Sequence, residues 1–193
     1  MFIQTEQTPN PATLKFLPGC EVAPAGSAEF KTAEEAKNAS PLAEKIFSVA
    51  GVCGVFLGRD FISVTKTDGV EWHEIKPAVL DMVMEHFTLG HPVLLEDAAA
   101  SAGDDAESSH APSELDSEIV KQIKELLDTH IRPAVARDGG DVLFDSYEDG
   151  IVYLHMKGAC SGCPSSTMTL KSGVQNLLQH YIPEVIDVQA IEA

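Results

Sequence analysis

The sequence predicts an α+β protein of two small domains, the second with the order α-β-β-α-β and two helices on one face of an antiparallel sheet. Three observations support this fold class. Residues 96–115 contain acidic side chains but neither lysine nor arginine, and they have almost nothing to bury. The segments on both sides combine helical periodicity with strand alternation. Short turns separate neighbouring strand patterns. We therefore predict domains over 1–95 and 116–193, joined by an acidic flexible linker over 96–115.

The first domain is predicted to hold two strand pairs and two helices. Ser40 is a good N-cap for a helix that begins at Pro41, because proline is tolerated in the first turn. The predicted elements are strands over 2–6 and 13–17, a helix over 41–49, a hairpin over 52–57 and 61–66, and a helix over 75–87. We find no phosphate loop or nucleophile motif here, and we expect His73, His86 and His91 to be surface or capping residues.

The second domain begins with an amphipathic helix and ends with a strand. The apolar residues of the first helix recur at helical spacing up to His130. Glu148-Asp149-Gly150 lies between two alternating runs and is typical of a hairpin. Pro183 ends the second helix. The predicted elements are a helix over 115–130, a turn over 137–141, strands over 142–147 and 151–156, a helix over 165–181 and a strand over 185–191.

The candidate site is the loop Gly158-Ala159-Cys160-Ser161-Gly162-Cys163-Pro164, between a predicted strand and a predicted helix. A Cys-x-x-Cys pair directs two thiolates to one soft metal centre. Cys163 also precedes a helix N-terminus, where the helix dipole lowers the pKa of a thiol. Tetrahedral sulfur sites for zinc or iron–sulfur clusters usually take four ligands, and this loop offers two.

This shortage of ligands leaves several interpretations open. Two chains can each donate Cys160 and Cys163 to a metal centre at a dimer interface. The pair can instead serve a dithiol oxidoreductase, although that motif normally lies within a βαβ arrangement and a hairpin precedes it here. A structural zinc site would need the same dimer or an extra ligand such as His155, which we expect to lie on the strand face or to support a ligand instead of binding the metal. From the residues alone we rank a shared iron–sulfur or zinc site first.

Composition narrows the class of protein further. The formal net charge of −17 disfavours binding to nucleic acid, because the surface would repel phosphates. No apolar run is long enough to span a bilayer, and the first residues show no targeting pattern. We therefore predict a cytoplasmic protein with reduced thiols and no membrane partner. Cys20 and Cys53 are interpreted as small packing residues.

Two sets of motifs resemble a known family. The run from Ile131 to Val142, the loop Gly158–Ser166 and Pro183-Glu184-Val185 are similar to the C-terminal domain of NifU-like proteins. The start, Phe2–Pro11 with Leu14-Lys15-Phe16, resembles the N-terminal domain of Nfu-type scaffold proteins. The resemblance covers nearly the whole chain apart from the linker.

The resemblance implies a scaffold or carrier for iron–sulfur cluster assembly rather than an enzyme. It implies that Cys160 and Cys163 bind a labile [4Fe–4S] cluster between the subunits of a homodimer and pass it to apo-proteins. A [2Fe–2S] form is the alternative, and zinc would bind such thiolates adventitiously. The expected partners are apo iron–sulfur recipients and the upstream cluster-assembly machinery. The recipients, the cluster donor and the role of the N-terminal domain, which either recognises targets or regulates access, stay open.

Overall fold

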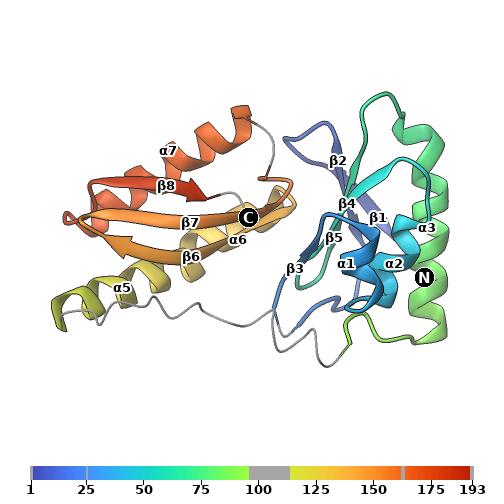
Figure 1. Cartoon of the computed structure of the whole chain (residues 1–193), viewed down its shortest axis with the longest axis horizontal. Helices are drawn as coiled ribbons and strands as arrows, with labels where there is room; N and C mark the ends of the chain where they lie inside the picture. The colour runs from blue at the N-terminus through green and yellow to red at the C-terminus, as the bar shows by residue number, and fades with distance from the viewer. Residues whose placement is uncertain (1, 25, 96–113, 162–163, 192–193) are drawn as a thin grey trace. The chain divides into compact units, whose positions relative to one another are not determined.

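The computed structural model describes residues 2–24, 26–95, 114–161 and 164–191, and for 114–117 and 164–170 it describes the backbone alone. The chain divides into two compact units, Met1–Asp104 and Asp105–Ala193 (Figure 1). Each unit combines a sheet with helices, which confirms the α+β class. The predicted linker lies outside the described residues except for Glu114 and Leu115, which begin a helix, and the domain bounds stay a prediction.

The N-terminal unit is a five-stranded antiparallel sheet in its described residues, with helices on one face (Figure 1). The strand order is β1-β2-β5-β4-β3. The strands are β1 (Gln4–Gln7), β2 (Thr13–Leu17), β3 (Ala28–Phe30), β4 (Val52–Leu57) and β5 (Ile62–Lys66). The helices are α1 (Ala33–Lys37), α2 (Pro41–Phe47) and α3 (Trp72–Leu89). The sequence did not predict β3 and α1, because segments of three and five residues carry too little periodicity.

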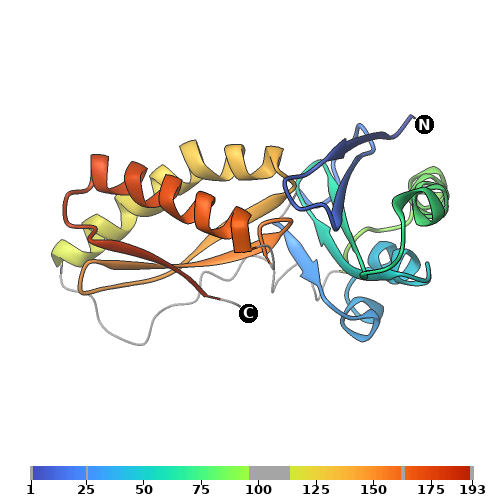
Figure 2. The same ribbon diagram turned by 90° about the horizontal axis from the view of Figure 1, so that it is seen from above.

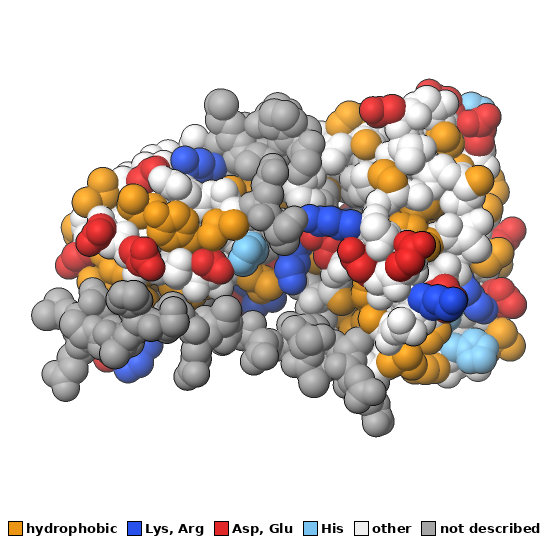
Figure 3. Space-filling model, in the orientation of Figure 1, with side chains coloured by type: hydrophobic (Ala, Val, Ile, Leu, Met, Phe, Trp, Pro, Cys, Tyr) orange, Lys and Arg blue, Asp and Glu red, His pale blue; other side chains and the backbone are white. Residues whose placement is uncertain are grey.

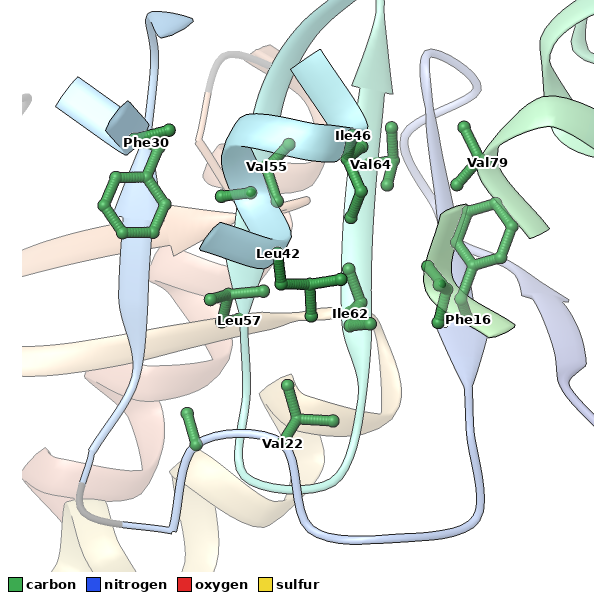
Figure 4. Close-up of a cluster of buried hydrophobic side chains, with 14 of the residues drawn as sticks. Phe16, Val22, Phe30, Leu42, Ile46, Val55, Leu57, Ile62, Val64 and Val79 are labelled. Carbon is green, nitrogen blue, oxygen red and sulfur yellow. The ribbon is translucent and has the colours of Figure 1, made fainter. Parts of the chain in front are cut away.

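The core of this unit forms where α2 and α3 pack on the sheet. Leu42 and Ile46 of α2 point toward Leu57 and Ile62 of the central strands, and all four side chains are fully buried (Figure 4). The predicted N-cap is present, since Ser40 Oγ accepts a hydrogen bond from the backbone N–H of residue 43 at 3.1 Å. The unit therefore has a hydrophobic core built from its own residues.

The C-terminal unit places its helices on one face of a three-stranded sheet, within the described residues (Figure 2). On the central strand, Val152, Leu154 and Met156 are buried beneath the helices, and the residues between them are only half-buried. The elements are α5 (Glu114–Leu126), η1 (Leu127–Ile131), α6 (Arg132–Arg137), β6 (Gly140–Glu148), β7 (Ile151–Gly158), α7 (Pro164–Tyr181) and β8 (Asp187–Ile191).

The sheet of this unit is mixed, where the sequence predicted a wholly antiparallel one. β6 and β7 pair antiparallel as the predicted hairpin, whereas β8 pairs parallel to β7. The reason is that α7 returns the chain along the sheet, so β8 starts at the same end as β7. The elements β7, α7 and β8 therefore form a βαβ unit.

The first helix of this unit continues beyond His130, where the sequence predicted its end. After α5 the chain makes a π-helical turn, in which the backbone N–H of Arg132 donates to the carbonyl of Leu127. Pro133 follows in the first turn of α6, where a residue without an N–H donor is tolerated. The wide turn thus lets the helix pass a proline that would otherwise break it.

Among the helices that the structure describes, none is long and apolar enough to cross a bilayer.

Candidate metal centre

Cys160 lies in the loop that follows β7, and its side chain is only 5% exposed. Hydrogen bonds fix the loop on both sides of the cysteine. The backbone N–H of Ala159 donates to the carbonyl of Gly139 at 3.1 Å. The N–H and hydroxyl of Ser161 both donate to the carbonyl of Gly158, at 3.1 and 2.9 Å. The first predicted ligand is therefore held at the end of β7, next to the turn that begins β6. Cys163, the second, lies outside the described residues.

Gly140 allows the close approach of Cys160 to the start of β6. A Cβ atom at Gly140 would lie 2.6 Å from the Cys160 Sγ atom and 2.7 Å from the carbonyl oxygen of Lys157. Its neighbour Gly139 and the facing Gly158 have φ values of 81° and 67°, which favour glycine. The glycines on both sides of the β6–β7 pair thus shape the seat of the sulfur.

An arginine–aspartate pair stabilises the same strand start. Arg132 of α6 makes a bidentate ion pair with Asp141, with Nε to Oδ1 at 2.9 Å and Nη2 to Oδ2 at 3.0 Å. Its third contact is Nη1 to Asp128 Oδ1 at 2.9 Å. These hydrogen bonds, chiefly the one to Asp141, raise the pKa of Arg132, so this side chain stays charged. The pair ties α6 to the residue next to Gly140, and bidentate geometry makes the contact specific.

His155 lies on β7 but does not face Cys160. It alternates with the buried residues of that strand, so it belongs to the sheet face away from the helices. Its Nε2 atom contacts Asp145 Oδ1 at 2.9 Å, and its Nδ1 atom is buried without a hydrogen-bond partner among the described residues. Within that part of the chain no three His, Cys, Asp or Glu side chains are grouped to hold a metal ion. The zinc alternative that used His155 gains no support from these contacts.

Three other predictions need correction or comment. Cys53 is exposed on β4, so its interpretation as a buried packing residue was wrong, and Cys20 is partly exposed. Partial desolvation raises the pKa of both thiols, and for Cys53 the negative charge of Asp68 raises it further. His73 and His91 are exposed as expected, but His86 is fully buried in α3. Sequence reasoning missed His86 because it occupies a helix position between Val83 and Gly90 that an apolar residue could equally fill.

The topology around Cys160 removes one argument made from the sequence. A dithiol motif normally lies between the strand and the helix of a βαβ unit, and the loop from residue 159 to 163 joins β7 to α7 in such a unit. The preceding hairpin therefore does not count against redox chemistry. The geometry allows either a soft metal or a thiol–disulfide couple at this position.

Comparison with known proteins shows what the chain is similar to. A family model described as scaffold protein Nfu/NifU N terminal matches residues 3–90, and a model of the NifU-like domain matches residues 123–189. The chain is 51% identical over 191 residues to "NifU-like protein 4, mitochondrial" of Arabidopsis thaliana, which covers 98% of this chain and 65% of that protein. It is 52% identical over 192 residues to "NFU1 iron-sulfur cluster scaffold homolog, mitochondrial" of Drosophila sechellia, covering 99% and 65%.

The chain thus spans just under two thirds of the length of these curated relatives. A solution NMR structure of a NifU-like protein from Saccharomyces cerevisiae aligns with a TM-score of 0.45 and 30% identity, over 49% of this chain and 85% of that one.

The names of the curated relatives contradict the cytoplasmic location predicted from the sequence, because these proteins are named as mitochondrial. The prediction depended on the first residues of the chain. Since the chain spans only part of its relatives, those residues say nothing about a leader.

Proposed function

Because the chain belongs to the family of Nfu/NifU-type scaffold proteins, we propose that it holds an iron–sulfur cluster and passes it to apo-proteins. The supporting observation is the position of Cys160 at the end of β7. Hydrogen bonds of the neighbouring Ala159 and Ser161 hold its loop, and its Sγ atom lies where a side chain at Gly140 would be. A mitochondrial location is the one that the names of the relatives favour.

The ligand count supports a cluster shared by two chains. Cys160 and Cys163 provide two sulfurs per chain, and a [4Fe–4S] cluster takes four. We propose that a homodimer holds one such cluster, with two thiolates from each subunit. A cluster held in this way has no complete ligand set in either subunit. A recipient can therefore replace the cysteines stepwise by thiolate exchange, and the protein needs no redox turnover.

Anaerobic reconstitution with iron and sulfide tests this function. We expect four irons and four sulfides per dimer, with Mössbauer parameters of a [4Fe–4S] cluster and native mass spectrometry giving the mass of two chains with one cluster. A measured content of two irons per dimer would indicate a [2Fe–2S] cluster instead of the [4Fe–4S] form. A zinc-only protein after reconstitution would contradict the cluster proposal.

The βαβ position of the cysteine loop favours one second candidate, a dithiol oxidoreductase. This function requires a reversible disulfide between Cys160 and Cys163 with a reduction potential in the physiological range. Turnover of insulin disulfides with a thiol reductant tests it. Steady turnover that Cys160→Ser abolishes would favour the enzyme, and rates equal to the reductant alone would exclude it.

A further inference from the structure

One face of the C-terminal sheet has no helix on it in the described part of the chain. The helices pack on the other face, where Val152 and Leu154 are buried (Figure 2). Ile151 and Tyr153 alternate with them on β7 and are half-buried. A solvated sheet face normally carries polar side chains.

This open face, defined here as Leu143, Ile151, Tyr153, His155 and Ile191, is an apolar strip around His155 that polar residues border. The register places Gln189 beside Tyr153 and Asp187 beside Ile151, and Asp145 contacts His155. The register places Leu143 opposite His155, and His155 beside Ile191, so these three residues form one row across the three strands. Tyr153 and Ile151 follow along β7. Figure 3 shows hydrophobic side chains gathered on this face of the C-terminal unit. An apolar strip of this kind on a sheet face without helices is a candidate interaction site.

The two ends of the open face differ in chemistry. β7 ends at Gly158, just before Cys160, and it begins at the hairpin turn. At that turn Glu148, Asp149 and Glu184 are exposed, and no ion pair to them is found among the described residues. Acidic side chains lie toward this end in Figure 3. An eight-residue strand separates the acidic end from the cysteine end by roughly 23 Å.

We propose that the open face is the docking surface for the apo-protein that receives the cluster, through an apolar segment flanked by lysine or arginine. This inference rests on the proposed cluster transfer. A second copy of the chain is a poorer occupant, because the acidic ends of two copies would repel each other in a protein with a net charge of −17. Basic side chains at the acidic end of the face would orient the recipient, so that its own cysteines face the loop of Cys160.

An NMR titration with a synthetic probe tests the docking surface without any cluster. The probe is a 14-residue amphipathic peptide of leucine and lysine, and its counterpart replaces every lysine with glutamate. With the lysine peptide we expect the largest amide shifts in β7 and β8, at Tyr153 and Ile191. We expect none with the glutamate peptide. Equal shifts over α5 and the sheet would show unspecific attraction to an acidic protein and would overturn the proposal.

Matched variants distinguish binding at the open face from attraction to the net charge of the protein. The double variant Glu148→Lys/Glu184→Lys should lower the affinity for the lysine peptide about tenfold or more at low salt, because like charges then face each other. The control Glu118→Lys/Glu125→Lys changes the net charge equally, at exposed positions of α5, and should leave the affinity within about twofold. Equal weakening by both pairs contradicts the proposal.

The apolar contribution has its own pair of variants. Tyr153→Ser removes an aromatic ring from the open face, whereas Tyr181→Ser removes one that is 55% exposed at the end of α7. We expect only Tyr153→Ser to lower the affinity for the lysine peptide. Cluster content, measured separately on the same variants, should stay at the wild-type level. If Tyr153→Ser has normal cluster content and does not affect peptide binding, only the docking surface is refuted. If the wild-type protein binds no cluster, only the proposed function is refuted.

Discussion

Replacing Gly140 with alanine tests whether the seat of the sulfur depends on the absence of a side chain. The new Cβ atom would lie 2.6 Å from Cys160 Sγ, 2.7 Å from the Lys157 carbonyl oxygen and 3.2 Å from Cys160 Cβ. Gly140 is not among the glycines with positive φ, so the backbone conformation itself accepts alanine. The cost of the substitution is therefore steric.

The magnitude follows from which atoms can move. Ordinary contacts begin near 3.4 Å, so two neighbours must each retreat by most of an ångström. The Lys157 oxygen belongs to a paired strand, and Cys160 is packed in the core, so neither moves freely. Overpacking of this kind costs about 1–3 kcal/mol in the free energy of unfolding. The control is Gly173→Ala on the exposed side of α7, where nothing lies within 4 Å and alanine should stabilise by about 0.5–1 kcal/mol.

The chain offers a separate spectroscopic probe for each unit. Its single tryptophan, Trp72, lies in the N-terminal unit, and its three tyrosines, at 147, 153 and 181, lie in the C-terminal unit. In urea unfolding, Gly140→Ala should lower the midpoint of the tyrosine signal and leave the tryptophan signal unchanged. Iron content after reconstitution should also fall, because the thiol is displaced. Wild-type values for both the tyrosine midpoint and the iron content would refute the reasoning.

Three further outcomes are expected. Serine at Cys160 or Cys163 should abolish cluster binding with both units still folded, whereas serine at Cys20 or Cys53 should retain it; equal iron loss in all four variants would contradict the ligand assignment. The protein without cluster should sediment as a monomer and the reconstituted protein as a dimer, so a monomer with a complete cluster would exclude the shared site. Burial lowers the pKa of His86, so the unfolded state binds more protons below about pH 6.5. The stability of the N-terminal unit should therefore fall as the pH drops through that value, and His86→Leu should flatten the slope of the tryptophan midpoint against pH.

The sequence predicted most of the regular elements because their signals are local. Ser40 with Pro41 marked the start of α2, and alternation on β7 marked a strand with one buried face. The parallel pairing of β8 was not predictable in this way, since it depends on the path of α7 across the sheet. The predicted helix end at His130 was wrong for a related reason. A π-turn has no signal in the composition, and a proline such as Pro133 normally ends a helix.

At the candidate site, too, the contacts that depend on the fold could not be predicted from local sequence. Cys160 was identified from its spacing to a second cysteine, but the residues that seat it come from the other side of a hairpin. Gly140 was interpreted only as part of a turn, although at its register position opposite Gly158 any side chain would meet the Cys160 sulfur. Asp141 likewise carried no metal-binding signal, and its role became visible only through the bidentate contact with Arg132. The candidate ligands of such a site can be predicted from sequence because their chemistry is specific. The residues that position them cannot, because many small or charged residues would fit until the strand register is known.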